Sequence, residues 1–282
     1  GEHADFDEYL YYKTRLLNMC GIGLVNKDDE HAPQIIKAAN CELYTYSEES
    51  KEADFVASDI RYVSQPDFVG TEFHISGKYD MEVRLGIPGL FNVVNALAAV
   101  SVCSFLGLDQ ARISHALENI RVNGRMEIVY TSERCTVLVD YAHNAVSMES
   151  LLSTLRDYKP KRLVCVFGCG GNRSKDRRYS MGEIGGKMAD LSIITADNSR
   201  YEKVEDIIAD IRGSIEKTGG KFIEIPDRRE AIRYSILHAQ PGDMVAVIGK
   251  GHEDYQEING VRHHFLDREV IEETVKELGE KA

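Results

Sequence analysis

The sequence predicts an α/β fold: a C-terminal domain with a Rossmann-like, mostly parallel sheet, preceded by part of a second α/β domain. After about residue 122, apolar β-branched runs alternate with helical segments, which is typical of βαβ units whose sheet is covered on both faces. Before it, hairpin-like segments precede a long apolar helix, and Asn123-Gly124 is a turn signal between the two patterns. We therefore expect domains over residues 1–121 and 122–282.

The N-terminal part is predicted to mix strands and helices. Short apolar runs and alternating segments predict strands at 21–26, 41–46, 54–63, 73–79 and 83–87. Helical patterns predict helices at 9–17, 90–106 and 109–120. The second of these helices is apolar on most sides, so we expect it to be buried.

The C-terminal part alternates strands and helices in a regular way. Continuous apolar runs predict strands at 136–139, 162–167, 191–195, 222–225 and 244–248. Amphipathic patterns predict helices at 148–158, 180–189, 204–217, 228–238 and 267–278. The Asn259-Gly260 pair predicts a late hairpin at 257–261.

Composition excludes several classes of protein. The 282 residues carry 34 basic and 46 acidic side chains, a formal net charge of −12, which argues against non-specific nucleic-acid binding. With 43% hydrophobic residues and no apolar run near the ~18 residues of a membrane helix, the chain is predicted to be a folded, soluble protein. The six scattered cysteines are interpreted as buried free thiols of a cytoplasmic protein.

Polar or glycine-rich segments follow four of the predicted C-terminal strands. Ligands of such sheets bind at the carboxyl ends of the strands, so these segments should meet at one edge and form a site. The segments are Asp140-Tyr141-Ala142-His143, Gly168 to Arg178, Asp197-Asn198-Ser199-Arg200 and Gly249-Lys250-Gly251-His252-Glu253.

The loop from Gly168 to Arg173 resembles a glycine-rich phosphate loop, although its spacing fits no standard motif and a plain tight turn is equally compatible. Four cations and one acid follow closely, a local charge of +3 that predicts an anion site. They are Arg173, Lys175, Arg177 and Arg178, with Asp176.

The segment Asp197-Asn198-Ser199-Arg200 allows two interpretations. Asn198 or Ser199 would suit the N-cap of the helix predicted from residue 204. A cap needs no arginine, however, and the planar guanidinium of Arg200 suits a carboxylate. Gly249 to Glu253 is likewise either a surface loop or a site in which Glu253 binds a substrate ammonium.

Three further groups are ambiguous on spacing alone. Asp140 and His143 are compatible with nucleotide or metal contacts but are weak signals as a pair. Asn92 and Asn95 lie on one helix face, where they either cap the helix start or present amides to a nucleobase. Lys13 would ordinarily be an exposed lysine, with a reactive neutral amine as the alternative.

Taken together, these segments resemble the Mur ligase family over essentially the whole chain. Gly89 to Ala99 resembles the family's adenine-side helix, and Asn123-Gly124-Arg125-Met126-Glu127 its G-R-M-E element. Val139 to His143 resembles its D-Y-A-H element. The segments 167–173, 197–200 and 249–256 are similar to those of the members that add the third amino acid of the cell-wall peptide.

The resemblance implies an ATP-dependent amide-forming reaction in peptidoglycan synthesis. ATP would phosphorylate the carboxylate of UDP-MurNAc-L-Ala-D-Glu, and an amino-acid amine would attack the acyl phosphate, with Mg²⁺ neutralising phosphates. It implies a carbamylated Lys13 with a catalytic and metal role, and a metal role for His3. ATP contacts are implied for Asn92, Asn95, Arg125, Asp140 and His143. The amino-acid pocket is implied to comprise Arg173, Asp197, Asn198, Ser199, Arg200, Gly249 and Glu253.

The resemblance also implies which amino acid is added. Family members that add meso-diaminopimelate have D-N-P-R, whose arginine meets the distal carboxylate, whereas lysine-adding members lack this arginine. Here Ser199 replaces the proline but Arg200 remains, so we expect meso-diaminopimelate. Asn144-Ala145-Val146 also departs from the family's usual T-P-D.

The family's G-T-N-G-K-T/S phosphate loop and its UDP-binding N-terminal domain do not occur in the chain, which starts without methionine and resembles a cut product. We therefore expect part of a cytoplasmic bacterial ligase, inactive alone, and favour a monomer. The alternatives are the lysine-adding ligase and a non-catalytic amino-acid or nucleotide binding module. A dinucleotide oxidoreductase is disfavoured because no G-x-G-x-x-G follows a strand.

Overall fold

The computed structural model describes residues 4–279, and their contacts divide the chain into two compact units. Unit 1 comprises residues 1–62 and 70–120, and unit 2 comprises residues 63–69 and 121–282. The expected domain limits, 1–121 and 122–282, stay a prediction, although the units divide one residue earlier than that boundary.

Unit 1 is built on a five-stranded sheet in the order β1-β2-β3-β4-β5. The strands are β1 (Ile22–Asn26), β2 (Glu42–Ser47), β3 (Phe55–Gln65), β4 (Phe68–Gly77) and β5 (Met81–Leu85). Its helices are α1 (Phe6–Thr14), the 3₁₀ turn η1 (Arg15–Asn18), α2 (Ala32–Ala38), α3 (Leu90–Phe105) and α4 (Gln110–Asn119). Helix α3 buries Val93, Leu97 and Val100 against the sheet, as its apolar sequence predicted.

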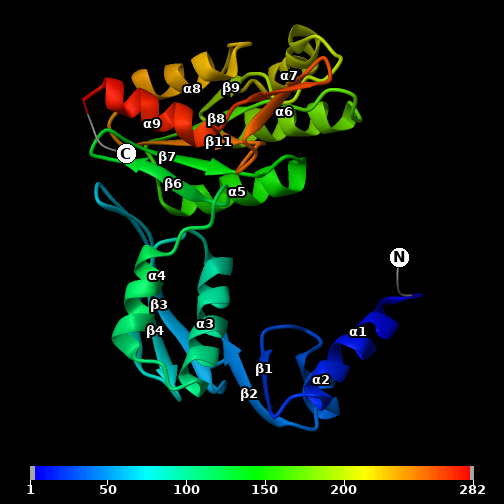
Figure 1. The fold of residues 1–282 in the computed structure, drawn as a ribbon, viewed down its shortest axis with the longest axis vertical. Helices are drawn as coiled ribbons and strands as arrows, with labels where there is room; N and C mark the ends of the chain where they lie inside the picture. Colours follow the sequence, from blue (N-terminus) through cyan, green and yellow to red (C-terminus); the bar gives the residue numbers. More distant parts are fainter. Residues whose placement is uncertain (1–3, 280–282) are drawn as a thin grey trace. The chain divides into compact units, whose positions relative to one another are not determined.

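Unit 2 has a six-stranded sheet in the order β10-β9-β8-β11-β7-β6 (Figure 1). Its strands are β6 (Glu127–Thr131), β7 (Cys135–Asp140), β8 (Arg162–Phe167), β9 (Leu191–Ile194), β10 (Phe222–Glu224) and β11 (Asp243–Ile248). Neighbouring strands are parallel except for β6, which is antiparallel to β7. The predicted mostly parallel sheet is therefore confirmed.

Helices cover both faces of this sheet. They are α5 (Ala145–Asp157), α6 (Asp176–Met188), α7 (Val204–Thr218), α8 (Arg228–Leu237) and α9 (Asp267–Glu277). One face packs against α8 and α9 through alternate strand residues such as Val137, Val139 and Val245. Figure 1 shows α5 and α6 on the other side. A two-stranded hairpin, β12 (Tyr255–Ile258) with β13 (Val261–His264), follows β11.

Two general expectations concern the cysteines and the possibility of a membrane-spanning helix. All six cysteines are described and carry free thiols, but Cys20, Cys41 and Cys103 are only half-buried, so the prediction of buried thiols holds for Cys135, Cys165 and Cys169 alone. Among the described residues, no helix is long and apolar enough to cross a membrane.

Candidate functional site

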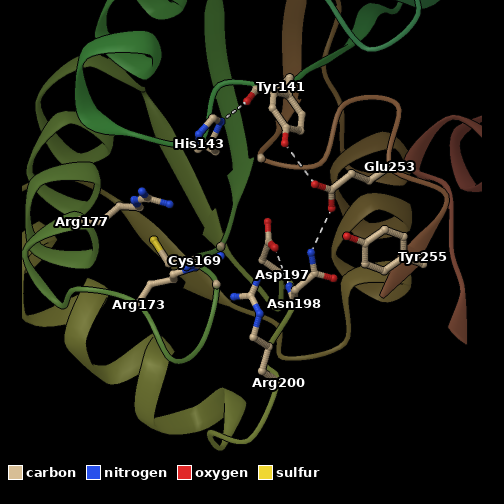
Figure 2. Close-up of a pocket in the computed structure, with 13 residues that line it drawn as sticks. Tyr141, His143, Cys169, Arg173, Arg177, Asp197, Asn198, Arg200, Glu253 and Tyr255 are labelled. Carbon is tan, nitrogen blue, oxygen red and sulfur yellow. Dashed lines mark hydrogen bonds between the residues drawn. The ribbon is translucent and has the colours of Figure 1, made fainter. Parts of the chain in front are cut away.

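A cavity of about 370 Å³ lies at the carboxyl ends of β7, β8, β9 and β11 in unit 2. The four segments expected to meet at this sheet edge all contribute to it. Its lining residues are Tyr141, His143, Gly168, Cys169, Gly170, Arg173, Arg177, Asp197, Asn198, Arg200, Gly249, Glu253 and Tyr255. Three arginines and two carboxylates among them give the lining both signs of charge. In Figure 2, Arg173 and Arg177 lie on one wall, opposite Asn198, Glu253 and Tyr255.

The segment after β9 is buried and held in place by backbone contacts. Asp197 Oδ1 accepts from the Asn198 amide at 2.5 Å, and the Asn198 carbonyl accepts from the Gly171 amide at 2.8 Å. Gly249 has φ +111°, and a Cβ there would lie 2.7 Å from Asp197 Oδ2, so only glycine fits beside this carboxylate. Helix α7 begins after Lys203 and not at Asn198 or Ser199, so the N-cap interpretation is wrong.

Glu253 is held by donors from three segments. Tyr141 Oη donates to Oε1 at 3.2 Å, and Asn198 Nδ2 donates to Oε2 at 3.0 Å, as Figure 2 shows. The fully buried Lys250 places Nζ 3.4 Å from Oε2. Burial and the neighbouring Glu253 carboxylate raise the pKa of Tyr141, so the phenol stays protonated and donates. The result is an anchored carboxylate in the cavity wall.

Arg200 presents a partly buried guanidinium to the cavity. Its Nη1 donates to the Gly171 carbonyl at 2.7 Å, which fixes the guanidinium beside the glycine loop after β8. Its backbone is left-handed, with φ +52°. A Cβ at Gly171 would come 1.9 Å from the Ser199 carbonyl, so the two loops approach more closely than any larger residue permits.

The predicted charge of +3 after β8 is reduced by ion pairing. Arg178 is buried and pairs with Glu202 at 2.8 Å and with Asp210 at 3.0 Å. Lys175 also pairs with Asp210, at 3.1 Å. The prediction that all four cations serve an anion is therefore wrong for these two, because acids on and before α7 neutralise them. Arg173 and Arg177 do line the cavity.

The segment after β7 supplies a second cluster, beside the cavity. Asp140 is buried, and its oxygens accept from the Met126 amide at 2.8 Å and the Ala142 amide at 2.7 Å. Burial raises the pKa of Asp140 despite these hydrogen bonds. Arg125 lies over the Tyr141 ring at 4.9 Å, and His143 is exposed with Nδ1 2.9 Å from the Tyr141 carbonyl. The guanidinium of Arg125 and the imidazole of His143 are therefore both exposed at the surface.

The predicted residues of unit 1 lie on its helices. Asn92 Nδ2 donates to the Pro88 carbonyl at 2.7 Å, so its side chain ties the start of α3 without capping the helix amides, while Asn95 is exposed. Lys13 on α1 is exposed, with Nζ 5.3 Å from the centre of the Tyr9 ring. His3 lies outside the described residues.

The described residues do not form a metal site by themselves. Within residues 4–279, no three His, Cys, Asp or Glu side chains converge closely enough to hold an ion. Mg²⁺ prefers several oxygen ligands, and an unmodified Lys13 is a cation above an aromatic ring. The described residues, with Lys13 unmodified, therefore do not fit Mg²⁺.

Comparison with known proteins identifies the family. The family model "Mur ligase, glutamate ligase domain" matches residues 124–251, and "Mur ligase middle domain" matches residues 1–103. The chain belongs to the Mur ligase family. The resemblance that the sequence predicted is thereby confirmed.

Curated Mur ligases resemble the chain along nearly its full length. It is 39% identical over 273 residues to the UDP-N-acetylmuramoyl-L-alanyl-D-glutamate--2,6-diaminopimelate ligase 2 of Clostridium acetobutylicum, covering 96% of this chain and 56% of that protein. The ligase of the same name, without the number, from Clostridioides difficile is 38% identical over 286 residues, covering 98% and 57%. The chain thus spans a little over half the length of these relatives.

Solved structures agree with this assignment. A UDP-N-acetylmuramoyl-L-alanyl-D-glutamate--2,6-diaminopimelate ligase has a TM-score of 0.79 and 34% identity, covering 99% of this chain and 58% of that one. The UDP-N-acetylmuramate-alanine ligase of Thermotoga maritima has a TM-score of 0.64 and 18% identity, covering 98% and 56%. At that identity the second likeness shows only the fold.

Several residues of this Mur ligase site were not predicted from the sequence. Tyr141 and Tyr255 line the cavity, and the Nζ atom of Lys250 lies 3.4 Å from Glu253 Oε2. Tyr141 and Lys250 stand inside the motifs that drew attention, so their neighbours were the available signal. Tyr255 lies in the segment 249–256, whose resemblance to the family was the available signal, and it is the first residue of β12.

Proposed function

We propose that this chain is part of an ATP-dependent ligase that joins meso-diaminopimelate to UDP-MurNAc-L-Ala-D-Glu in the cytoplasm of a bacterium. The observation that supports this is the mixed charge of the cavity, with Arg200 and Glu253 on the same lining. Meso-diaminopimelate carries two carboxylates and two amino groups, so a lining with both signs of charge complements it.

In this proposal, each end of the cavity has a role. Arg200 binds the distal carboxylate with its planar guanidinium, while Arg173 supplies a further cation. Glu253, anchored by Tyr141 and Asn198, accepts from an ammonium group. Asp197, Ser199 and Gly249 shape the wall between them. A ligand bound this way has one amine held in a fixed position for reaction.

The reaction itself would need the remainder of a longer protein. ATP would transfer its terminal phosphoryl group to the substrate carboxylate, and the amine nitrogen would then attack the acyl carbon. A C–N bond forms, the C–O bond to phosphate breaks, and the amine loses a proton. We assign nucleotide contacts to Arg125, Asp140 and His143, and to Asn92 and Asn95, on the family resemblance. Carbamylation of Lys13 would turn an amine into an oxygen ligand for Mg²⁺.

A binding experiment tests the amino-acid assignment. We expect calorimetry of the full 282-residue chain to show binding of meso-diaminopimelate without ATP turnover. Arg200→Ala should lower that affinity by about 1.5–3 kcal/mol, the value of a charge-assisted hydrogen bond, and should leave L-lysine binding unchanged. Equal affinities of the wild type for lysine and diaminopimelate would instead support the lysine-adding alternative. Unchanged diaminopimelate affinity in the variant would contradict the role of Arg200.

A further inference from the structure

The β12–β13 hairpin runs beside the segment Asp197–Arg200 and is hydrogen-bonded along it. Gln256 Nε2 donates to the Asp197 carbonyl at 3.1 Å, and the Glu257 amide donates to Asn198 Oδ1 at 2.9 Å. The Arg200 amide donates to the Glu257 carbonyl at 3.0 Å, and the Arg200 carbonyl accepts from the Asn259 amide at 2.6 Å. The hairpin therefore fixes the backbone of a cavity-lining segment with which it is not contiguous in sequence.

This backbone needs external support at Arg200. The residue has a left-handed φ of +52°, which non-glycine residues adopt only at a cost. The preceding residue is Ser199, so no proline ring fixes the φ angle at that position. The parallel bridge between Arg200 and Ile258 holds the backbone of this segment instead.

Glu257 also contacts the side chain of Arg200. Its Oε2 lies 3.6 Å from Arg200 Nε, and the two side chains are only 21% and 23% exposed. Arg200 lines the cavity, whereas Glu257 is not among the described residues of its lining. The guanidinium is thus fixed at Nη1 by the Gly171 carbonyl and approached at Nε by the carboxylate, so its position relative to the cavity is defined from two sides.

We propose that Glu257 is the positioning residue for Arg200, and that the β12–β13 hairpin determines through it which amino acid the cavity selects. The proposal deepens the proposed function and rests on it, since Arg200 is the group assigned to the distal carboxylate. Glu257 itself does not touch the ligand. It restricts the guanidinium to one orientation before binding, which reduces the ordering cost of binding a carboxylate.

If Glu257 had a purely structural role, Glu257→Ala would lower the unfolding temperature; the positioning role predicts little change. Partly exposed ion pairs add little to folding stability, and truncating the side chain leaves the backbone hydrogen bonds of the hairpin in place. We therefore expect Glu257→Ala to unfold at about the same temperature as the wild type. Glu277→Gln is the matched control, because it alters an Arg–Glu pair (Arg233–Glu277, 2.7 Å) away from the cavity.

The first measurement does not depend on any ligand. The Nε–Hε group of Arg200, assigned by its loss in Arg200→Ala, is followed by ¹H–¹⁵N NMR of the full chain. We expect slow solvent exchange in the wild type and in Glu277→Gln, and fast exchange in Glu257→Ala. Glu257→Gln keeps an oxygen acceptor and should lie between them. Unchanged exchange in Glu257→Ala would overturn the proposal, whatever the chain binds.

The second measurement is a double-mutant cycle on affinity. Glu257→Ala should weaken meso-diaminopimelate binding about tenfold and leave L-lysine binding unchanged, and in the Arg200→Ala background it should have no further effect on either. An equal loss for both ligands, or the same loss with alanine at 200, would overturn the proposal. If the wild type bound no diaminopimelate, the proposed function would fail, and the NMR result would still decide the role of Glu257.

Discussion

Glu253 and Arg200 are the two residues to which we assign opposite charges of the ligand: Glu253 an ammonium group and Arg200 the distal carboxylate. Each is fixed by neighbours before any ligand arrives: Glu253 by Tyr141, Asn198 and Lys250, and Arg200 by the Gly171 carbonyl. Groups that are already oriented lose less entropy on binding. The two residues should therefore affect different ligands in different ways.

Glu253→Gln should weaken both meso-diaminopimelate and L-lysine, since both carry the ammonium that we assign to Glu253. The expected loss is about 1.5–3 kcal/mol for each, because a hydrogen bond to a charged acceptor is removed. Calorimetry of the full chain measures it, with Glu277→Gln as the control. A loss confined to diaminopimelate would show that Glu253 contacts the distal end instead.

At the scale of elements, a buried ion pair joins two helices to two strand ends. Arg228 at the start of α8 is fully buried and bonds both oxygens of Asp267 at 2.7 Å. It also donates to the carbonyls of Ala196 at 3.2 Å and Ile248 at 3.0 Å. These carbonyls directly precede Asp197 and Gly249, so the pair supports two cavity-lining segments at once.

Arg228→Met should destabilise the protein strongly. It leaves the Asp267 carboxylate buried without its partner, which costs about 3–5 kcal/mol. Urea unfolding measures the loss, and Arg229→Gln, which alters a neighbouring exposed pair with Glu273, should change stability by less than about 1 kcal/mol. Similar stability for the two variants would contradict a supporting role for Arg228.

The pairing of α6 with the start of α7 should make stability sensitive to acid. The hydrogen bond from Arg178 lowers the pKa of Glu202 below its ordinary value of 4.5. A carboxyl group with a lowered folded-state pKa contributes stability above its unfolded pKa, and this contribution is lost as the pH falls through the folded value. Glu202→Gln should therefore be less stable at pH 7 and lose less stability on going below pH 4.5. Parallel stability curves for variant and wild type in urea would contradict this.

Elements also show how much of the fold the sequence could predict. Strands β7, β8, β9 and β11 were predicted because buried parallel strands are continuous apolar runs. Helix α2 and strand β6 were missed, since each is short and mixes polar with apolar residues. Helix α6 begins at Asp176 and not near Ser180. The charged first turn of this helix gives no apolar pattern, and Arg178 is buried there only because it pairs with acids distant in sequence.

The site likewise combines residues that the local sequence pattern could place with residues whose roles depend on contacts distant in sequence. Segments that follow strands could be placed at one sheet edge by topology alone, and Arg200, Glu253 and Asp197 were found this way. Lys250 and Glu257 could not, because their roles depend on side-chain contacts that only the folded hairpin and its loop create. Arg178 was predicted to bind a ligand anion because the sequence does not show that Glu202 and Asp210 pair with it in the fold.

At the scale of the whole molecule, the chain carries the middle and C-terminal parts of a Mur ligase and spans a little over half the length of its relatives. Unit 2 holds the cavity entirely within its own residues, so amino-acid binding can be tested on this chain. Ligation is a property that we assign only to the longer protein.

The central claim is that the cavity of unit 2 binds meso-diaminopimelate with its distal carboxylate at Arg200. A crystal structure of the full chain with meso-diaminopimelate tests this most directly. We predict the ligand between Arg200 and Glu253, with one carboxylate on the guanidinium and an ammonium within hydrogen-bond distance of Glu253. A ligand bound elsewhere, or one whose carboxylates both avoid Arg200, would contradict the account.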